Sequence, residues 1–166
     1  MQRISVFDML KIGVGPSSSH TMGPWRAAER FLKECQADDT FARIEKLTVE
    51  LFGSLAKTGR GHGTDIAVFM GLCGEDPTSC DTSLIDEKVA QIRSQKALHL
   101  LQSKQLSFDP TSDLIFHFDE SLPYHPNGIR FTVTLNDGQQ KQSTYYSVGG
   151  GFVVKEGEVS EVSTVT

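Results

Sequence analysis

The stretch IRFTVTLNDGQQKQSTYYSV, at residues 129–148, predicts the fold of this chain more directly than any other. In its first half an apolar residue stands at every second position from Ile129 to Leu135. This period of two is typical of a strand with one buried face. The Asn-Asp-Gly run at 136–138 tolerates positive φ, so we expect residues 142–148 to return as the second strand of a β-hairpin.

Further strands are expected on both sides of this hairpin. The segment 46–52 alternates apolar and polar residues in the same way, which predicts a half-buried strand. Shorter strands are expected at 114–118 and 152–154. The three glycines at 149–151 indicate a tight bend or a flexible exit from the sheet.

Three helices are expected, separated by polar and glycine-rich segments. Residues 23–36 carry apolar side chains at spacings of three and four, and Pro24 suits a first helical turn. A short helix at 65–72 and a longer amphipathic helix at 84–101 follow. The glycine-rich segment 53–64 is expected to be a loop.

The order of these elements predicts the fold class. Strands and helices mix without strict β-α-β alternation, which favours an α+β domain with a mixed sheet and helices packed on it. Residues 1–155 are expected to form this domain. Residues 156–166 have little pattern and are expected to begin a linker.

Composition and charge exclude several classes of protein. The chain has 166 residues, 38% hydrophobic and 22% charged, which is typical of a globular domain. A net charge of −5 without a Lys/Arg cluster argues against nucleic acid or an anionic membrane as partner. Its apolar stretches are too short to cross a bilayer, and residues 1–10 lack the order of a signal peptide, so we expect a cytoplasmic protein.

The cysteines are expected to be packing residues. Cys35, Cys73 and Cys80 are separated by 38 and 7 positions, which fits neither a disulfide framework nor a CxxC metal site. Free cysteines usually behave as small buried hydrophobic residues.

The loop GPSSSHT at 15–21 is the most unusual feature of the sequence. A helix is expected to begin about two residues later, and a helix N-terminus presents unpaired N–H groups and partial positive charge. The hydroxyl groups beside it could complete a cradle for a small anion such as a carboxylate. A serine-rich N-cap is the alternative, and the residues alone leave both open.

Two other segments could carry chemistry. In the run GSLAKTGRGHGTD at 53–65, glycines flank His62 and leave room for a close approach, while Thr64 or Asp65 could cap the next helix. The spacing of a Walker loop is absent, so nucleotide phosphate binding is rejected. In LPYHPNG at 122–128, His125 precedes a proline inside a turn. We expect His99, in a helix, and His117, in a strand, to be structural or surface residues.

Together these segments resemble the start of the bacterial iron–sulfur L-serine dehydratases. The resemblance spans nearly the whole chain in order, through these runs: SVFDM at 5–9, KIGVGPSSSHTMGP at 11–24, GSL at 53–55, TG at 58–59, GHGTD at 61–65, HPNG at 125–128 and YYSVGGGF at 145–152. In that family the region is the β domain or β subunit. The resemblance implies the fold of the allosteric-substrate-binding domain of some phosphoglycerate dehydrogenases.

The resemblance also implies a reaction and a division of roles. L-serine would be converted to pyruvate and ammonia, with His125 as the base that takes the Cα proton. The expected substrate-binding residues are Ser17, Ser18, Ser19, His20, Thr21, His62, Thr64 and Asp65.

The resemblance implies partners that complete the site. A [4Fe–4S] cluster would be held by an α domain or subunit, with no ligand from this chain, so the isolated chain is expected to be inactive. A homo-oligomer is also expected. The alternatives are a regulatory module that binds a small carboxylate or amino acid, and a plain dimerisation domain.

Overall fold

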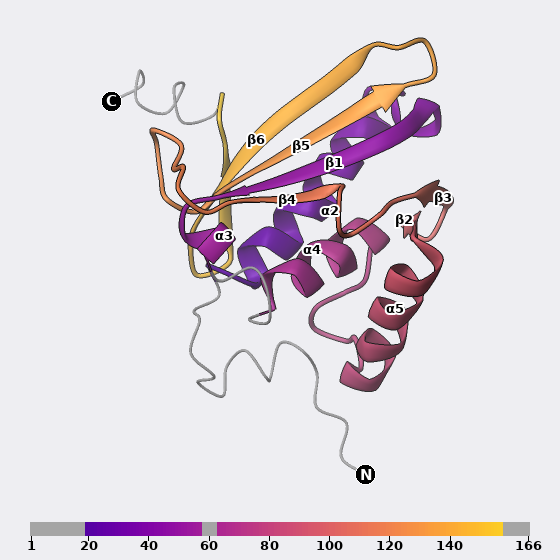
Figure 1. Ribbon diagram of the computed structural model, residues 1–166, viewed down its shortest axis with the longest axis horizontal. Coiled ribbons are helices and arrows are strands. Elements are labelled where there is room, and N and C mark those ends of the chain that lie inside the picture. The colour runs from indigo at the N-terminus through magenta and orange to yellow at the C-terminus, as the bar shows by residue number, and fades with distance from the viewer. Residues whose placement is uncertain (1–18, 58–62, 158–166) are drawn as a thin grey trace.

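The computed structural model describes residues 19–57 and 63–157, and it shows helices packed on one face of a mixed β-sheet (Figure 1). Helices α2 and α4 cover that face. Helix α5 and a two-stranded hairpin lie at one end of the sheet, and α3 and the loop after β4 lie at the other. The predicted α+β class is confirmed.

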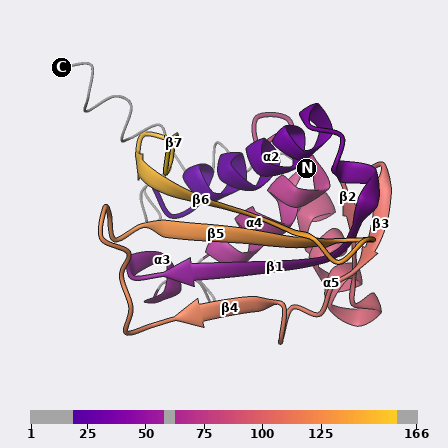
Figure 2. The ribbon, with the colours of Figure 1, turned by 90° about the horizontal axis from the view of Figure 1, so that it is seen from above.

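The main sheet has five strands in the order β4-β1-β5-β6-β7, which Figure 2 shows from one edge to the other. β1 and β4 are parallel, and the other neighbours are antiparallel. The strands are β1 (Ile44–Phe52), β4 (Leu114–His117), β5 (Gly128–Leu135), β6 (Gln140–Gly149) and β7 (Phe152–Lys155).

The predicted hairpin is confirmed as β5 and β6, with Ile129 opposite Tyr145 and Phe131 opposite Ser143. The apolar residues that alternate along β5 are all buried, at 4% exposure or less. Gly138 has φ of +86°, as its turn requires. The glycines at 149–151 all have positive φ and turn the chain from β6 into β7.

Helix α2 (Met22–Ala37) buries its apolar face against the sheet and against α4 (Thr64–Cys73). A β-carbon on Gly71 of α4 would lie 2.2 Å from the carbonyl oxygen of Trp25, so this glycine allows the two helices to approach closely. The short 3₁₀ helix η1 (Phe41–Arg43) leads from α2 into β1. Among the described residues, no helix is long and apolar enough to span a membrane.

Two expectations about secondary structure were wrong. The helix expected at 84–101 is α5 (Thr82–Gln95), followed by β2 (Ala97–Leu100) and β3 (Lys104–Ser107). Lys96 ends the helix with φ of +51°, and the apolar residues after it alternate into the core as a strand. The loop expected at 53–64 includes the one-turn helix α3 (Ser54–Lys57), because Leu55 and Ala56 are buried in the core.

The cysteines are buried, as expected, and are free thiols. Cys35 lies on the buried face of α2 and Cys73 at the end of α4. Burial raises the pKa of each of these thiols. They are therefore packing residues in this fold.

Candidate functional site

The N-terminus of α2 carries the first part of the candidate site. Thr21 is the N-cap residue, but its side chain makes no capping hydrogen bond. The residue is only 6% exposed, and its Oγ1 is buried without a hydrogen-bond partner. The first turn of α2 contains no acidic residue. A buried hydroxyl without a hydrogen-bond partner at a helix N-terminus suits an anionic ligand.

The N-terminus of α4 lies directly beside it. Thr64 Oγ1 donates a hydrogen bond of 2.7 Å to the carbonyl oxygen of His20, and a β-carbon on Gly63 would lie 3.5 Å from Cγ2 of Thr21. Gly63, with φ of +96°, is the N-cap of α4, so the expected side-chain cap from Thr64 or Asp65 is not formed. The positive ends of two helix dipoles therefore meet at one place.

Asn127, at the end of the loop after β4, joins this pair of helix ends to the sheet. It is 8% exposed, and its Nδ2 donates to the carbonyl oxygen of Ser147 at 3.1 Å. Its Oδ1 lies 3.2 Å from Nε2 of His20. Its backbone N–H donates to Nδ1 of His125 at 3.0 Å. His20 and His125, 105 positions apart in the sequence, thus contact the same residue.

The loop that carries His125 is attached to the end of β1. The backbone N–H of Gly53 donates to the carbonyl oxygen of Glu120 at 2.7 Å, and that of Ser54 donates to Pro126 at 3.0 Å. A β-carbon on Gly53 would lie 2.5 Å from the carbonyl oxygen of Pro126. Gly53 is therefore needed for the close approach that holds this loop in place.

The structure brings together only some of the residues predicted for the site. His20, Thr21, Thr64 and His125 lie in one cluster, and Ser19 is in the turn before His20. Ser17, Ser18 and His62 lie outside the described residues. The carboxylate of Asp65 forms an ion pair with Arg93 of α5 at 3.0 Å and also accepts a hydrogen bond from the backbone N–H of Ile66. Its substrate-binding role stays a prediction.

Sequence reasoning missed Asn127 and Ser147 as members of this cluster. Asn127 stands inside the HPNG run, but asparagine is common in turns for conformational reasons alone. Ser147 is buried in β6, with an Oγ that has no hydrogen-bond partner.

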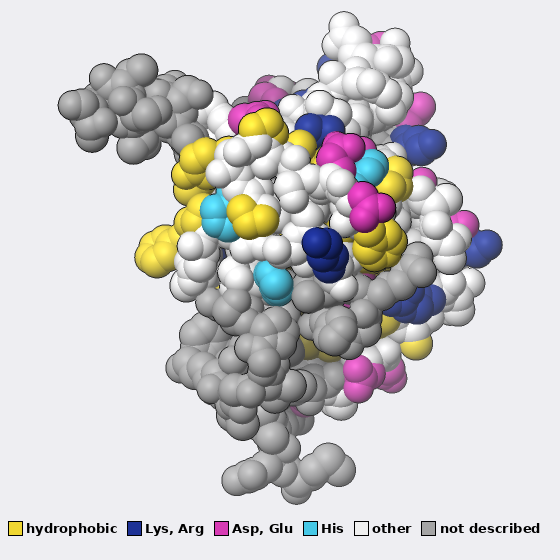
Figure 3. Space-filling model, turned by 60° about the vertical axis from the view of Figure 1, so that its left-hand side comes forward, with side chains coloured by type: hydrophobic (Ala, Val, Ile, Leu, Met, Phe, Trp, Pro, Cys, Tyr) yellow, Lys and Arg dark blue, Asp and Glu magenta, His cyan; other side chains and the backbone are white. Residues whose placement is uncertain are grey.

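Exposed hydrophobic side chains lie beside His125 and where β6 turns into β7. Phe152 is 70% exposed, Tyr124 is 49% exposed and Val148 is 38% exposed. The ring of Tyr124 packs edge-on against Tyr146 of β6, so it is fixed beside His125. Figure 3 turns this end of the molecule toward the viewer and shows hydrophobic side chains next to histidines.

Comparison with known proteins identifies the family of this domain. A family model described as serine dehydratase beta chain matches residues 5–158. This chain belongs to the serine dehydratase beta chain family. It is 43% identical to an L-serine dehydratase of Streptomyces coelicolor over 94% of its length, and 38% identical to L-serine dehydratase 1 of Escherichia coli over 92%. It spans about a third of the length of these relatives, 34% of each.

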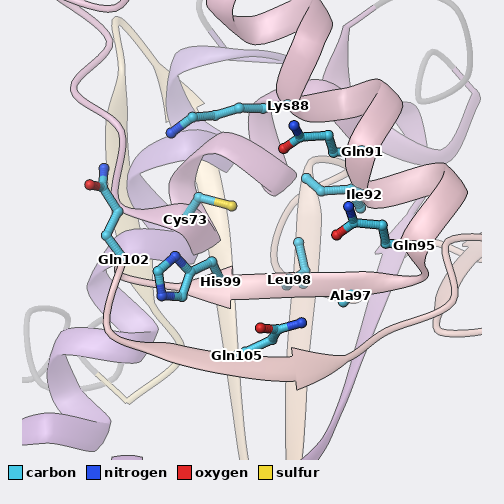
Figure 4. Close-up of a pocket in the computed structure, with 10 residues that line it drawn as sticks. All are labelled: Cys73, Lys88, Gln91, Ile92, Gln95, Ala97, Leu98, His99, Gln102 and Gln105. Carbon is cyan, nitrogen blue, oxygen red and sulfur yellow. The ribbon is translucent and has the colours of Figure 1, made fainter.

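The other two described histidines of this beta chain lie outside the cluster. His117 pairs with Glu50 at 3.0 Å and stacks on Phe52, which agrees with the structural role expected for it. His99 lies in β2, not in a helix, and lines a separate hollow of about 240 Å³ between α5 and the β2–β3 hairpin (Figure 4).

That hollow has a different chemical character from the histidine cluster. Neutral amide side chains surround it, and Lys88, its cation, is paired with Glu75. Its glutamines are Gln91, Gln95, Gln102 and Gln105. It shares no residue with the His20–Asn127–His125 cluster, which is the candidate active site of this beta chain.

Proposed function

We propose that this chain forms one side of the active site of an L-serine dehydratase, an enzyme that converts L-serine to pyruvate and ammonia. The observation that carries the proposal is the shared contact of His20 and His125 with Asn127, beside the N-termini of α2 and α4. The relatives named L-serine dehydratase support the choice of reaction.

In this proposal the N-terminus of α2 binds the carboxylate of L-serine. The buried Oγ1 of Thr21 has no hydrogen-bond partner, so a carboxylate oxygen could satisfy it. The hydroxyls of Ser17, Ser18 and Ser19 and the ring of His62 would complete this binding. Three further residues would instead contact the ammonium or hydroxyl group of L-serine: His20, Thr64 and Asp65. The hydroxyl proton of Thr64 is already donated to the carbonyl oxygen of His20, Nε2 of His20 is bound to Asn127, and the Asp65 carboxylate is itself an anion. Partial positive charge at the N-terminus of α2, whose first turn has no acidic residue, favours the anionic group, whereas the first turn of α4 already contains the Asp65 carboxylate, paired with Arg93.

His125 is proposed to contact the reacting part of the substrate. The reaction removes the Cα proton and the β-hydroxyl of L-serine, and the resulting aminoacrylate tautomerises and hydrolyses. A histidine half-buried at the edge of the cluster can take part in proton transfer or stabilise developing charge. The assignment of His125 as the base stays a prediction.

The iron–sulfur cluster implied by the resemblance does not fit the described residues of this chain. Its ligands would be cysteine thiolates, but the cysteines here are buried in the core and burial raises the pKa of each. No group of His, Cys, Asp and Glu side chains suited to a metal occurs within the ranges 19–57 and 63–157. We therefore assign the cluster to the rest of the enzyme and route no step through it.

The rest of the enzyme is proposed to cover the cluster. The chain matches about a third of each relative, which leaves two-thirds of their length to supply a partner domain. The exposed side chains of Tyr124, beside His125, and of Val148 and Phe152, at the turn from β6 to β7, are suited to such a contact.

A chimera tests this function. The chain would replace its matching segment in the Streptomyces coelicolor relative, and pyruvate release from L-serine would be measured anaerobically. We expect an active chimera, and His125→Ala should lower kcat by about a hundredfold or more. His99→Ala is the matched control and should have near-normal activity.

Two outcomes would change the conclusion. Normal turnover by the His125→Ala chimera would remove His125 from the chemistry. If that variant and His20→Ala both kept normal kcat and KM but lost the dependence of rate on an added small carboxylate, the regulatory alternative would be favoured.

A further inference from the structure

Three polar groups of Asn127 contact the carbonyl oxygen of Ser147, Nε2 of His20 and Nδ1 of His125, and the role of the Ser147 carbonyl in hydrogen bonding is fixed. The carbonyl oxygen of Ser147 can only accept, so the Asn127 atom 3.1 Å away must be Nδ2. The other side-chain atom, which faces His20, is then Oδ1 and can only accept. Nε2 of His20, 3.2 Å from it, must therefore carry a proton and donate.

The same reasoning fixes the ring of His125. The backbone N–H of Asn127 can only donate, and it points at Nδ1 of His125 at 3.0 Å. Nδ1 must therefore hold a lone pair. In the neutral imidazole the remaining nitrogen, Nε2, then carries the proton.

Asn127 thus makes the two histidines present different groups to the site. The N–H of His20 is bound to Asn127, and in the neutral ring Nδ1 carries the lone pair. The lone pair of His125 is bound to Asn127, and its Nε2–H points away from that bond. Because Asn127 is buried and also holds Ser147 through its own backbone carbonyl, at 3.0 Å, this arrangement is rigid.

We propose that Asn127 is a positioning residue that fixes neutral His125 as a hydrogen-bond donor to the substrate, through Nε2–H. This proposal rests on the proposed function and replaces base catalysis by His125 with electrophilic catalysis. The Cα proton then passes to a separate general base of the complete active site, and its loss places negative charge on the carboxylate oxygens of L-serine. A fixed neutral imidazole N–H stabilises such charge without transferring its proton.

The hydrogen bond from the backbone N–H of Asn127 to Nδ1 of His125 can be tested in this chain without an activity assay. Amide hydrogen exchange of Asn127, followed by NMR, should accelerate by up to about tenfold in His125→Leu, which lacks the acceptor. His99→Leu is the matched control and should leave this amide unchanged. At roughly pH 8.5, where histidine is neutral, His125 should show a protonated Nε2 and an unprotonated Nδ1. Unchanged exchange in His125→Leu, or a protonated Nδ1, would overturn the proposal.

The donor role is tested in the chimera by comparing His125→Gln with His125→Leu. Glutamine retains an N–H donor near the position of Nε2 but is too weak a base to take the Cα proton. We expect His125→Gln to keep kcat within about tenfold of the parent, and His125→Leu to lose a hundredfold or more. Equal loss in both variants would overturn the donor role and support the base.

The side chain of Asn127 has its own test. Asn127→Asp keeps an acceptor for Nε2 of His20, and Asn127→Leu removes it. Both variants keep the backbone N–H that binds His125, so a difference between them reports on the side-chain bond to His20. If that bond helps to hold the loop in place, Asn127→Asp should have a kcat at least tenfold higher than Asn127→Leu, at equal KM. Equal kcat in both would mean a purely structural residue. An inactive parent chimera would overturn the proposed function, while the exchange measurement would still decide whether the Asn127–His125 bond exists.

Discussion

A β-carbon placed on Gly23 would lie 1.8 Å from Oγ of Ser147 and 2.6 Å from its Cβ. The first turn of α2 therefore packs directly on β6 at the candidate site, with no room for a methyl group. Gly23→Ala should destabilise the chain by about 1–3 kcal/mol, because the Cβ of Ser147 is fixed by the backbone of β6 and no rotamer of this side chain relieves the overlap. The free energy of unfolding in urea measures this loss.

The contact can be relieved from the other side. Ser147→Gly removes both clashing atoms, so the double variant with Gly23→Ala should be more stable than the sum of the single changes predicts. Gly157→Ala is the matched control, since its β-carbon meets nothing within 4 Å. Simple additivity of the two changes would mean that α2 and β6 are not held in this contact.

The ion pair between Asp65 and Arg93 gives a second prediction. The Asp65 side chain is 8% exposed and that of Arg93 is 48% exposed, so losing Arg93 leaves a buried carboxylate without its cation. Arg93→Leu should cost about 1–3 kcal/mol of unfolding free energy. Asp65→Asn should cost less, because it removes the charge itself and an amide oxygen can still accept from Ile66.

The same variants test the substrate-binding role predicted for Asp65. If that role is correct, Asp65→Asn raises the KM of the chimera for L-serine and Arg93→Leu does so less. A larger effect of Arg93→Leu on stability, with KM unchanged in both, would make Asp65 a structural residue.

Local pattern predicted most of this fold, and non-local contacts account for what it missed. The β5–β6 hairpin follows from alternation over adjacent residues, so the sequence was sufficient. The segment after Gln95 fits a helix as well as a strand by its apolar spacing. Pairing of β2 with β3 and the left-handed conformation of Lys96 decide for the strand, and neither is visible in that spacing.

The candidate site shows the same limit more strongly. The loops that contain His20 and His125 were sufficient to mark both residues as candidates for the site. Their common contact could not be recognised in this way, because Asn127 reaches a partner 107 positions away and another 20 positions away. Such contacts exist only once α2 and the loop after β4 are packed on the same end of the sheet.

Tyr145 makes the unfolding free energy of the chain depend on pH in the alkaline range. Burial raises the pKa of Tyr145, and its hydroxyl donates to Glu34, which raises the pKa further. The folded state thus favours the protonated phenol, and the stability this gives is complete below the unfolded-state pKa of about 10 and is lost as pH rises above it. Unfolding free energy measured between about pH 9 and pH 11 should fall in the parent chain.

Tyr145→Phe is the comparison for that fall. It should cost about 1 kcal/mol near neutral pH through the lost hydrogen bond, and its stability should decline less above pH 10. Part of the decline should persist, since burial also raises the pKa of Tyr146. Parallel curves for parent and variant would mean that the Tyr145 phenol is not protected by the fold.

Phe152 distinguishes the stability of the chain from the proposed assembly with a partner domain. Its side chain is 70% exposed, so Phe152→Ser should change the unfolding free energy by no more than about 0.5 kcal/mol. If the rest of the dehydratase covers this end of the sheet, the same change should weaken binding of the separately expressed remainder of the Streptomyces coelicolor relative by about tenfold or more. Calorimetry measures that affinity.

Leu84→Ser is the matched control, because Leu84 is 39% exposed on α5, on a different element from those that hold the histidine cluster. Equal weakening by both variants would show that Phe152 is not a specific contact of the partner, whereas weakening by Phe152→Ser alone would place the partner at the turn from β6 to β7.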